Sequence, residues 1–584
     1  MRLLYATETG TAAELSLLAA EYFAKYTNHL KVLEVAEYDY TQLPLEDIVL
    51  FIVSTTGDGE VPQDMKQFWR FLLRKSLPSN SLSRVQYAVF GLGDSSYLRF
   101  NAAARKLDKR LQDLGAIPLL PIKLGDEQER IGLEGALRDW LVQLTTRLQL
   151  EEMCTNYSTD HIYYYRVIER KEPLESVKST SVDKWNAGEC RASHQSFWEA
   201  RVVSNQLLVA EDCEHEVRQI SLESPSIPYR PGDVVYIYPK NSAAQVGKLI
   251  KMMGYNPKQV LEIERLNDIA PVLNLNCTCT LESLVASQFD LCALPRRTFF
   301  RKLAKFATDP EERDRLLYLS TSEGADDFRQ YVTIERHHIL MCLRDFPSAR
   351  PGIEDLIQFL PRLRPRPFSI ASSPSYHRGF IEVCVSVVNY QDCFGFWRQG
   401  LCSSFLKRSR CGDIIPVFIQ RGSLKFPHGM DNRPCIMIGP GTGVSPFRSY
   451  LWECFVHSRQ LIAPESCRIL FFGCRYEQKD FLYKEEWEKL KQAHILSQLH
   501  TAFSRDSSKK VYVQDRLKEQ TEVIKELVLK GGIIFVAGSA KQMPRDVREA
   551  LQQVISTFVS SEKEAESYLK KMEASGRLQI ECWS

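Results

Sequence analysis

The sequence predicts an α/β protein of several domains, in which a doubly wound parallel sheet is followed by an antiparallel β-barrel with a helical insertion and then by a second parallel sheet. Three observations predict this fold class. The chain has 584 residues, which is too many for one hydrophobic core. Apolar strands alternate with helical stretches at both ends of the chain, and strand-like alternation of apolar and polar residues returns in its middle.

The N-terminal domain is expected over residues 1–148. Its apolar segments are separated by helical stretches, which is typical of parallel strands buried on both faces. These segments are LLYAT, VLEVAEY, IVLFIVST, VQYAVFGLG and IPLLPIKLG. Residues 149–196 are polar and show little sustained period, so they are expected to form a linker that contains at most one strand.

The barrel is expected over residues 197–430, where FWEARVVSNQLL and HEVRQISLE predict antiparallel strands and YRPGDVVYIYPKN adds a turn followed by alternation. Between about residues 242 and 353 the apolar residues follow a helical period, which predicts an insertion into the barrel. The last domain, over residues 431–584, contains strand-to-helix units in PCIMIGPGTGVSPFRSYL, RILFFGCRY and GIIFVAGSA.

The composition excludes several classes of protein. The 75 Lys and Arg residues nearly balance the 73 Asp and Glu residues, so the net charge of +2 argues against a nucleic-acid-binding protein. The sequence has no apolar run of about 18 residues and begins without a signal peptide, so we expect a cytoplasmic protein without a membrane anchor. The 16 cysteines lack metal-ligand spacing, which favours reduced, mostly buried thiols and no metal site.

The first candidate site lies in ATETGTAA, which follows the first strand and opens a helix. A tight turn at Gly10 and a helix N-terminus offer backbone N–H groups and a positive dipole end to an anion such as phosphate. No lysine follows the glycine, so the loop is not of the ATP-binding type. Taken alone, the stretch is equally compatible with an ordinary N-capped turn.

Two further glycine-bearing loops, STTGDGEVP and GLGDSSYLRFN, follow the strands IVLFIV and VQYAVF. In an open parallel sheet, loops after neighbouring strands meet at the carboxyl edge, so together the loops predict a bound mononucleotide. The glycines allow close approach of a flat ring. Tyr97 is a candidate to cover that ring, although it could also be a half-buried packing residue.

Two more clusters follow in the remaining domains. RPFS and GLCSSFL combine an arginine with a small turn before a helix, as a pyrophosphate site requires, although each alone could be structural. GPGTGVSPFR is a glycine turn that enters a helix, and it departs from GxGxxG. FSRDSSKKVYVQ brings two cations, a hydroxyl and a ring together, which would distinguish a 2′-phosphate from a bare ribose, although the stretch could also be a solvated charged loop.

In this order, the motifs ATETGTA, STTGDGEVP, GLGDSSY, RPFS, GLCSS, GPGTGVSP, SR…KVYVQ and a tryptophan near the C-terminus resemble those of the diflavin reductases. The resemblance covers nearly the whole chain. It implies a flavodoxin-like FMN domain, then a ferredoxin-reductase-like antiparallel β-barrel with a helical insertion, then a Rossmann-like NADP-binding domain. Within this family the chain is similar to the cytosolic members of iron–sulphur protein assembly, through QDMKQFWRFLLRKSLP and RPFSIASS with GLCSS.

The resemblance also implies which residues hold the cofactors FMN, FAD and NADPH. The FMN set comprises Thr7, Glu8, Thr9, Gly10, Thr11, Ala12, Ser54, Thr55, Thr56, Gly57, Leu92, Gly93, Asp94, Ser95, Ser96, Tyr97, Leu98, Arg99, Phe100, Asn101 and Glu127. The FAD set comprises Arg336, Arg366, Pro367, Phe368, Ser369, Gly400, Leu401, Cys402, Ser403 and the stacking residue Trp583. The NADPH set comprises Thr442, Ser504, Arg505, Lys510, Val511, Tyr512, Val513, Gln514 and Asp546.

The implied reaction passes a hydride from NADPH to FAD and then single electrons to FMN and to an acceptor protein. Trp583 would cover the face that the nicotinamide needs and would have to swing aside. Several positions depart from membrane-bound relatives: Thr56 and Phe368 stand where tyrosines are usual, Ala537 replaces a cysteine and Glu581 replaces an aspartate. The hypothesis is therefore that Ser369 and Glu581 alone assist hydride transfer.

The resemblance suggests an anamorsin-like iron–sulphur protein as the acceptor. Acidic residues on or near the FMN loops could steer such a partner or could form an ordinary solvated rim. They are Asp58, Glu60, Asp64, Asp126, Glu127 and Glu129. Two alternatives stay open: a diflavin reductase for a haem-type acceptor, and a non-catalytic flavin-binding scaffold.

Overall fold

The structure is a computed structural model of the chain. It describes residues 1–8, 10–27, 29–56, 59–97, 99–152, 164–170, 198–223, 228–266, 278–427, 433–458, 467–540 and 542–583. The chain divides into two compact units, which are considered separately. The first comprises Met1–Ser196, Lys240–Arg364 and Asp392–Gly395, and the second comprises Phe197–Pro239, Pro365–Gln391 and Phe396–Ser584.

The first unit contains a parallel sheet in the order β2-β1-β3-β4-β5, with β6 beside β4. Its strands are β1 (Arg2–Ala6), β2 (Lys31–Glu34), β3 (Ile48–Ser54), β4 (Gln86–Gly93), β5 (Ile117–Pro118) and β6 (Lys123–Asp126). Its helices are α1 (Thr11–Phe23), α2 (Lys66–Leu72), α3 (Ala102–Asp113) and α4 (Gly132–Arg147), with the short turns η1 (Tyr40–Leu45) and η2 (Gln63–Met65).

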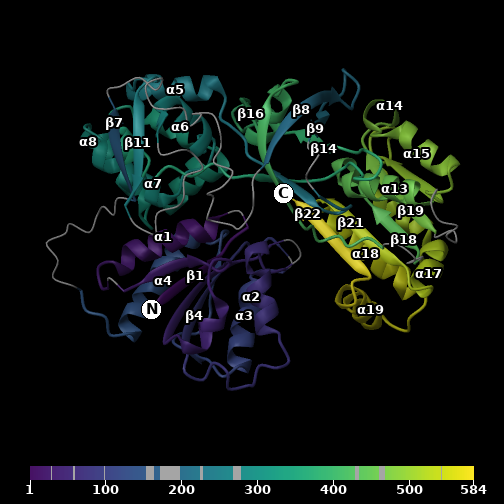
Figure 1. The fold of residues 1–584 in the computed structure, drawn as a ribbon, viewed down its shortest axis with the longest axis horizontal. Coiled ribbons are helices and arrows are strands. Elements are labelled where there is room, and N and C mark those ends of the chain that lie inside the picture. The colour runs from purple at the N-terminus through teal and green to yellow at the C-terminus, as the bar shows by residue number, and fades with distance from the viewer. Residues whose placement is uncertain are drawn as a thin grey trace. The chain divides into compact units, whose positions relative to one another are not determined.

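Helices cover both faces of this sheet, as Figure 1 shows. Side chains of α1 and α4 form one hydrophobic core with the sheet, and side chains of α2 and α3 form another. The central strand β3 is accordingly apolar throughout, and Val49 to Val53 are fully buried. Burial on two faces explains why this strand reads as a continuous apolar run, and it confirms the predicted doubly wound fold.

The first unit also contains a mainly helical region. Its helices are α5 (Ala243–Met253), α6 (Leu281–Gln288), α7 (Arg297–Leu303), α8 (Pro310–Ser320), α9 (Ala325–Phe328), α10 (Ile339–Asp345) and α11 (Ile353–Leu356), with η4 (Ala304–Phe306) and η5 (Arg329–Ile334). It includes an antiparallel sheet of β7 (Tyr165–Arg170), β11 (Val260–Arg265) and β12 (Thr278–Thr280). Strand β7 comes from the segment that the sequence predicts as a linker, so part of that segment is structured.

The second unit begins with the predicted barrel, an antiparallel sheet in the order β13-β10-β17-β8-β9-β14. Its strands are β8 (Trp198–Leu207), β9 (Glu216–Glu223), β10 (Val234–Ile237), β13 (Arg366–Ser369), β14 (Phe380–Val387) and β17 (Ile414–Gln420). An antiparallel bridge between Ile370 and Val383 joins the two edge strands. The sheet therefore closes on itself and leaves its inward-facing side chains in one core.

Two further elements complete the barrel region. The hairpin of β15 (Asn389–Gln391) and β16 (Trp397–Gln399) leads directly into helix α12 (Leu401–Arg408). Gly400 lies at the helix N-terminus, where its N–H donates to the Val388 carbonyl at 2.9 Å. The predicted motif GLCSSFL is thus the start of a helix.

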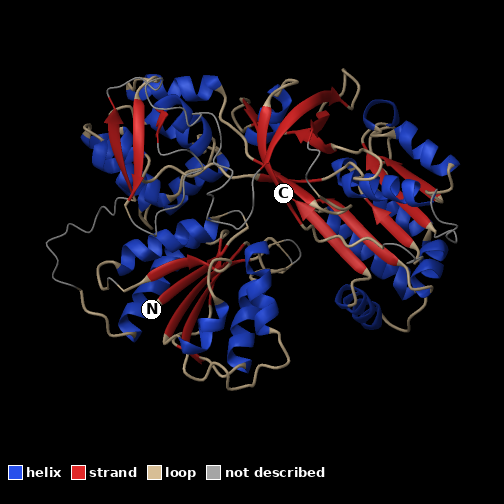
Figure 2. Cartoon of the chain, viewed as in Figure 1, coloured by secondary structure: helices blue, strands red, loops and turns tan. Residues whose placement is uncertain are grey.

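The rest of the second unit is a parallel sheet in the order β20-β19-β18-β21-β22. Its strands are β18 (Cys435–Ile438), β19 (Arg468–Cys474), β20 (Gln498–Phe503), β21 (Ile533–Ser539) and β22 (Leu578–Trp583). Its helices are η6 (Gly441–Val444), α13 (Ser445–Ser458), α14 (Glu477–Asp480), α15 (Lys484–Gln492), α16 (Val513–Glu519), α17 (Thr521–Leu529), α18 (Met543–Ser556) and α19 (Glu562–Ala574). Figure 2 shows the strands between the helices, which form separate cores with the two faces.

A buried arginine connects this sheet domain to the barrel. Arg448 on α13 is 3% exposed, and it donates to Glu382 of β14 at 2.6 Å and to Glu486 of α15 at 2.7 Å. It also donates to the carbonyl of Ala371 at 2.9 Å. Because removal of one partner would leave a buried charge unpaired, this cluster fixes how the two domains of the second unit pack.

Candidate functional site

The loop after β1 makes a glycine turn at the start of α1. Gly10 adopts φ 83°, in the left-handed region that favours glycine, and occupies the N-cap of α1. The N–H of Thr7 donates to a carboxylate oxygen of Asp64 at 2.9 Å. In the part of the chain that the structure describes, the buried Thr7 Oγ1 has no hydrogen-bond partner. A glycine turn at a helix N-terminus with an unused hydroxyl beside it fits a phosphate group.

The loops after β3 and β4 meet the first loop at the same edge of the sheet. Ser54 Oγ donates to the Ala6 carbonyl at 3.2 Å, and the N–H of Ala103 donates to Thr55 Oγ1 at 3.4 Å. Thr56 forms a narrow antiparallel bridge with Glu60. The predicted convergence of the three loops is thereby observed.

Hydrogen bonds to neighbouring residues fix the shape of the third loop. Asp126 accepts from the N–H of Ser95 at 2.9 Å, and Asn101 donates to the Gly125 carbonyl at 2.9 Å. Tyr97 is 47% exposed, so it is not packed into the core and its ring is accessible to a flat ligand. Glu127 is exposed, and its N–H donates to the Gly93 carbonyl.

Five other residues predicted to hold FMN are either buried or outside the described residues. Ala12 and Leu92 are buried among core side chains, so they could contact a ligand only through the backbone. Thr9, Gly57 and Leu98, like the acidic residue Asp58, lie outside the described residues.

Two arginines of the helical region contact the loop after β1 and the start of α1. Sequence patterns did not predict these contacts. Arg364 donates to the carbonyl of Gly10 and to Glu14 on α1, both at 2.9 Å. Arg296 donates to Glu14 at 2.9 Å and to Thr11 Oγ1 at 3.3 Å. Burial alone would raise the pKa of Glu14, but Arg364 and Arg296 lower it below its ordinary value. The loop is thus covered by two cations.

The carboxyl groups of Asp64 and Glu34 form a pair beside the loop after β1. Burial raises the pKa of Asp64 to about 7, and burial with the nearby Asp64 carboxylate raises that of Glu34 to about 9. The pair therefore retains a proton at neutral pH, which limits the negative charge beside the loop.

The motif RPFS coincides with strand β13, which pairs with β10 through Arg366 opposite Ile237 and Ser369 opposite Val234. Burial raises the pKa of the Cys402 thiol to about 12, and the nearby Arg366 guanidinium opposes this shift. Arg366 is therefore close enough to α12 for its charge to act on this thiol. Ser403 Oγ accepts from the N–H of Val388 at 3.1 Å. Arg336 belongs to the first unit, where it adopts φ 59°.

Ser369 and Glu581 are hydrogen-bonded to each other. The sequence hypothesis assigned both residues to hydride transfer. Ser369 Oγ donates to Glu581 Oε1 at 3.0 Å. The other carboxylate oxygen accepts from the N–H of Ser423 at 3.1 Å and from its hydroxyl at 2.8 Å. Burial raises the pKa of Glu581, and the hydrogen bonds from Ser423 and Ser369 only partly offset this. Sequence analysis did not identify Ser423.

The glycine loop after β18 lies against the end of β21. A Cβ atom on Gly443 would be 2.1 Å from the carbonyl oxygen of Ala537. Ala537 is in turn the Cα partner of Glu581 across β21 and β22, and Ser539 is the partner of Trp583. The strand pairing thus brings Ala537, Glu581 and Trp583 to the same edge as the loop that contains Thr442.

The residues predicted to recognise a 2′-phosphate follow β20. Ser504 donates from N and Oγ to the carbonyl of Cys474, at 3.0 and 3.3 Å. Arg505 ion-pairs with Glu214, whereas Lys510 and Tyr512 are exposed. Val511 is partly buried against the helices beneath the loop, and Val513 is buried there.

Two other residues of the predicted NADPH set lie together one turn further on. Gln514 donates to Asp546 at 3.2 Å, so α16 and the start of α18 are joined beside the Ser504 loop.

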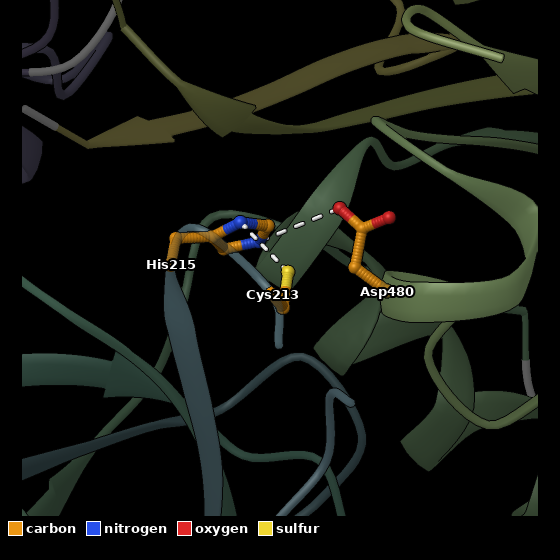
Figure 3. A group of neighbouring side chains, drawn as sticks. All are labelled: Cys213, His215 and Asp480. Carbon is orange, nitrogen blue, oxygen red and sulfur yellow. Dashed lines mark hydrogen bonds and ion pairs between the residues drawn. The ribbon is translucent and has the colours of Figure 1, made fainter. Parts of the chain in front are cut away.

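Cys213, His215 and Asp480 form a cluster with the residue types of a metal site (Figure 3). His215 faces Cys213 through Nδ1 and Asp480 through Nε2, each at 3.4 Å. Asp480 also accepts the N–H groups of Arg475 and Tyr476 at 3.0 and 2.7 Å. Because each ring nitrogen faces a neighbouring side chain, the cluster joins the β8–β9 loop to α14.

The family models identify a flavin-dependent, nicotinamide-dependent oxidoreductase. A family profile described as Flavodoxin matches residues 3–140, one described as FAD binding domain matches residues 191–405, and one described as Oxidoreductase NAD-binding domain matches residues 437–549. No helix among the described residues is long and apolar enough to span a bilayer.

Full-length relatives give the family. The chain is 36% identical to NADPH-dependent diflavin oxidoreductase 1 of Xenopus laevis, over 100% of this chain and 99% of that protein. It is 34% identical to the protein of the same name in Arabidopsis thaliana, over 100% and 98%. It is 28% identical to the NADPH–cytochrome P450 reductase of Dictyostelium discoideum, over 100% and 89%. The chain belongs to the NADPH-dependent diflavin oxidoreductases, and it is an enzyme that uses NADPH, FAD and FMN.

Proposed function

We propose that the three loops of the first unit hold FMN, that β13 with the start of α12 holds FAD, and that the loops after β18, β19 and β20 hold NADPH. Flavins accept a hydride as an electron pair and release electrons singly, which is the chemistry that FAD and FMN supply when bound. The hydrogen bond between Ser369 and Glu581, at the edge where Ala537 and Trp583 also lie, is the observation that best supports a hydride-transfer site.

In this proposal Ser369 acts through the direction of its hydrogen bond. Its hydroxyl hydrogen is committed to Glu581, so a lone pair of Oγ is left to accept from a donor in the site. Ser423 fixes the other side of the carboxylate. Trp583 ends β22 next to them, and its ring would have to move for the nicotinamide to enter.

Arg364 would support FMN binding from outside the flavodoxin-like domain. We expect Arg364→Ala to weaken FMN binding about fivefold, because a cation that donates to the phosphate loop is lost. The measurement is FMN dissociation, followed by the fluorescence of released flavin. Arg344→Ala, at an exposed position of the same helical region, is the control. Equal FMN retention in the two variants would contradict this role.

We propose that the electron acceptor is an iron–sulphur protein of the anamorsin type, and that the enzyme works in the cytoplasm. The supporting observation is the set of exposed carboxylates beside the FMN loops, namely Glu60, Glu127 and Glu129. Such a rim favours a partner with a basic docking face and raises its association rate at low salt. The resemblance to cytosolic members of iron–sulphur protein assembly is the second support.

Competition between two electron acceptors tests the proposed partner. Electron transfer to a purified iron–sulphur protein should be faster than transfer to a haem protein and should slow with rising salt. Neutralising Glu127 and Glu129 to glutamine should remove most of the salt dependence, while Glu151→Gln should not. Faster reduction of the haem protein would favour the alternative, which the similarity to a cytochrome P450 reductase supports.

A further inference from the structure

Glu214 occupies an anion-binding position within the proposed NADPH site. Its carboxylate ion-pairs with Arg505, accepts from Arg475 at 3.2 Å and accepts from the Tyr476 hydroxyl at 3.3 Å. Burial opposes the shift, but Arg505 and Arg475 lower the pKa of Glu214 below its ordinary value, so the carboxyl is ionised at neutral pH. Two guanidinium groups and a phenol are the donors that a phosphate monoester would also use.

The loop that carries Glu214 is held in place on both sides of that residue. His215 contacts Asp480 of α14, and Cys213 contacts His215, as Figure 3 shows. Asp212 pairs with Lys479 at 2.6 Å, and the N–H of Ala210 donates to the carbonyl of the same lysine at 2.8 Å. Because these contacts fix the loop, Glu214 is presented to the arginines by the fold rather than by one flexible surface side chain.

We infer that Glu214 is a specificity-determining residue whose carboxylate competes with the 2′-phosphate of NADPH for Arg505 and Arg475, and which thereby reduces the preference of the enzyme for NADPH over NADH. The inference rests on the proposed placement of the NADPH adenosine end at Arg505.

Charge and hydrogen-bonding chemistry give the direction of the effect. A 2′-phosphate carries about −1.5 to −2 charges at neutral pH, so it must displace the carboxylate or bind beside it against repulsion. A ribose with only a 2′-hydroxyl meets no such repulsion, because a hydroxyl can donate to a carboxylate, as in NAD-binding sites. Glu214 therefore penalises the phosphorylated nucleotide alone.

The test is calorimetric binding of 2′,5′-ADP and of 5′-ADP to the flavin-loaded enzyme at low ionic strength. Glu214→Gln should bind 2′,5′-ADP about 3- to 10-fold more tightly and should bind 5′-ADP no more tightly than the unchanged enzyme does. The ratio of kcat/KM for NADPH to that for NADH should rise by a similar factor. Glu211→Gln, at an exposed position of the same loop, is the matched control and should leave both affinities unchanged.

A second variant tests whether Glu214 acts on 2′,5′-ADP binding through Arg505. In an Arg505→Gln background, the gain from Glu214→Gln should largely disappear, because the two side chains compete through the same group. Unchanged or weaker binding of 2′,5′-ADP by Glu214→Gln, with normal flavin content and melting temperature, would overturn the inference while leaving the NADPH site intact. If Arg505→Gln alone did not weaken 2′,5′-ADP binding, the placement of the site would be wrong and the inference would fall with it.

Discussion

Replacing Glu581 by glutamine is expected to slow FAD reduction by NADPH about 10- to 100-fold, with both flavins still bound. The amide would donate to Ser369 Oγ and reverse the hydrogen bond that Ser369 now donates to the carboxylate. Ser369 would then present its hydroxyl hydrogen to the site, where it now presents only lone pairs. Anaerobic stopped-flow absorbance, with NADPH in excess, measures this rate directly.

The pH dependence of the melting temperature should distinguish a loss of hydride transfer from misfolding. Burial raises the pKa of Glu581, so over the window between its ordinary value of about 4.3 and the raised value, the folded protein binds more protons than the unfolded chain. Stability from this carboxyl is therefore present at low pH and is lost as pH rises through the folded pKa. The glutamine variant has no such loss, so its melting temperature should gain on that of the unchanged enzyme as pH rises.

Two comparisons complete the design. Glu562→Gln, in the exposed first turn of α19, should leave the rate of FAD reduction unchanged. Ser423→Ala removes the hydroxyl donor to the other carboxylate oxygen but keeps the backbone N–H donor, so it should cause a smaller loss. A Glu581→Gln enzyme that reduces FAD at the normal rate would show that Glu581 has no role in hydride transfer.

Gly443→Ala is expected to abolish NADPH binding at ordinary concentrations and to lower stability by about 2–3 kcal/mol. The added Cβ would lie 2.1 Å from the Ala537 carbonyl oxygen and 3.0 Å from the Gly538 Cα. These are backbone atoms of β21, so no side-chain rearrangement can relieve the clash. The loop between β18 and α13 must move away from the strand, and the loop residues proposed to contact NADPH move with it.

Gly441→Ala is the matched control in the same loop. Gly441 adopts φ 55°, but a Cβ there meets no atom within 4 Å. Alanine should cost only the left-handed backbone strain of about 1 kcal/mol and leave NADPH binding largely intact. Calorimetry with NADP⁺ and thermal unfolding measure both properties. If the two alanine variants lost the same NADPH affinity, close packing at Gly443 would not explain its presence.

The sequence predicted those parts of the fold that local patterns specify. IVLFIV is apolar throughout, as a strand buried on both faces requires, and it forms β3. RPFS forms the short barrel strand β13, which runs from Arg366 to Ser369. The loops after β1, β3 and β4 could be assigned to one edge because parallel strands place their carboxyl ends together. For the same reason the convergence of these three motifs was predictable without coordinates.

The contacts that sequence analysis missed join residues that are far apart in the chain. Arg364 and Gly10 are separated by 354 positions, and Arg505 and Glu214 by 291. Neither Arg364 nor Glu214 belongs to a motif, and an isolated charged residue in a sequence does not indicate its partner. The partner of β7 was also unpredicted, because the linker was expected to contain at most one strand and its polar residues do not indicate that this strand pairs with β11.

We conclude that one chain holds FMN and FAD and reduces both with NADPH. The most direct test releases and quantifies the flavins of the purified enzyme, then titrates it anaerobically with NADPH while flavin absorbance is followed. We expect equal amounts of FMN and FAD and complete bleaching after about two equivalents of NADPH per chain, because each flavin takes two electrons. A single flavin, or bleaching that stops after one equivalent, would contradict it.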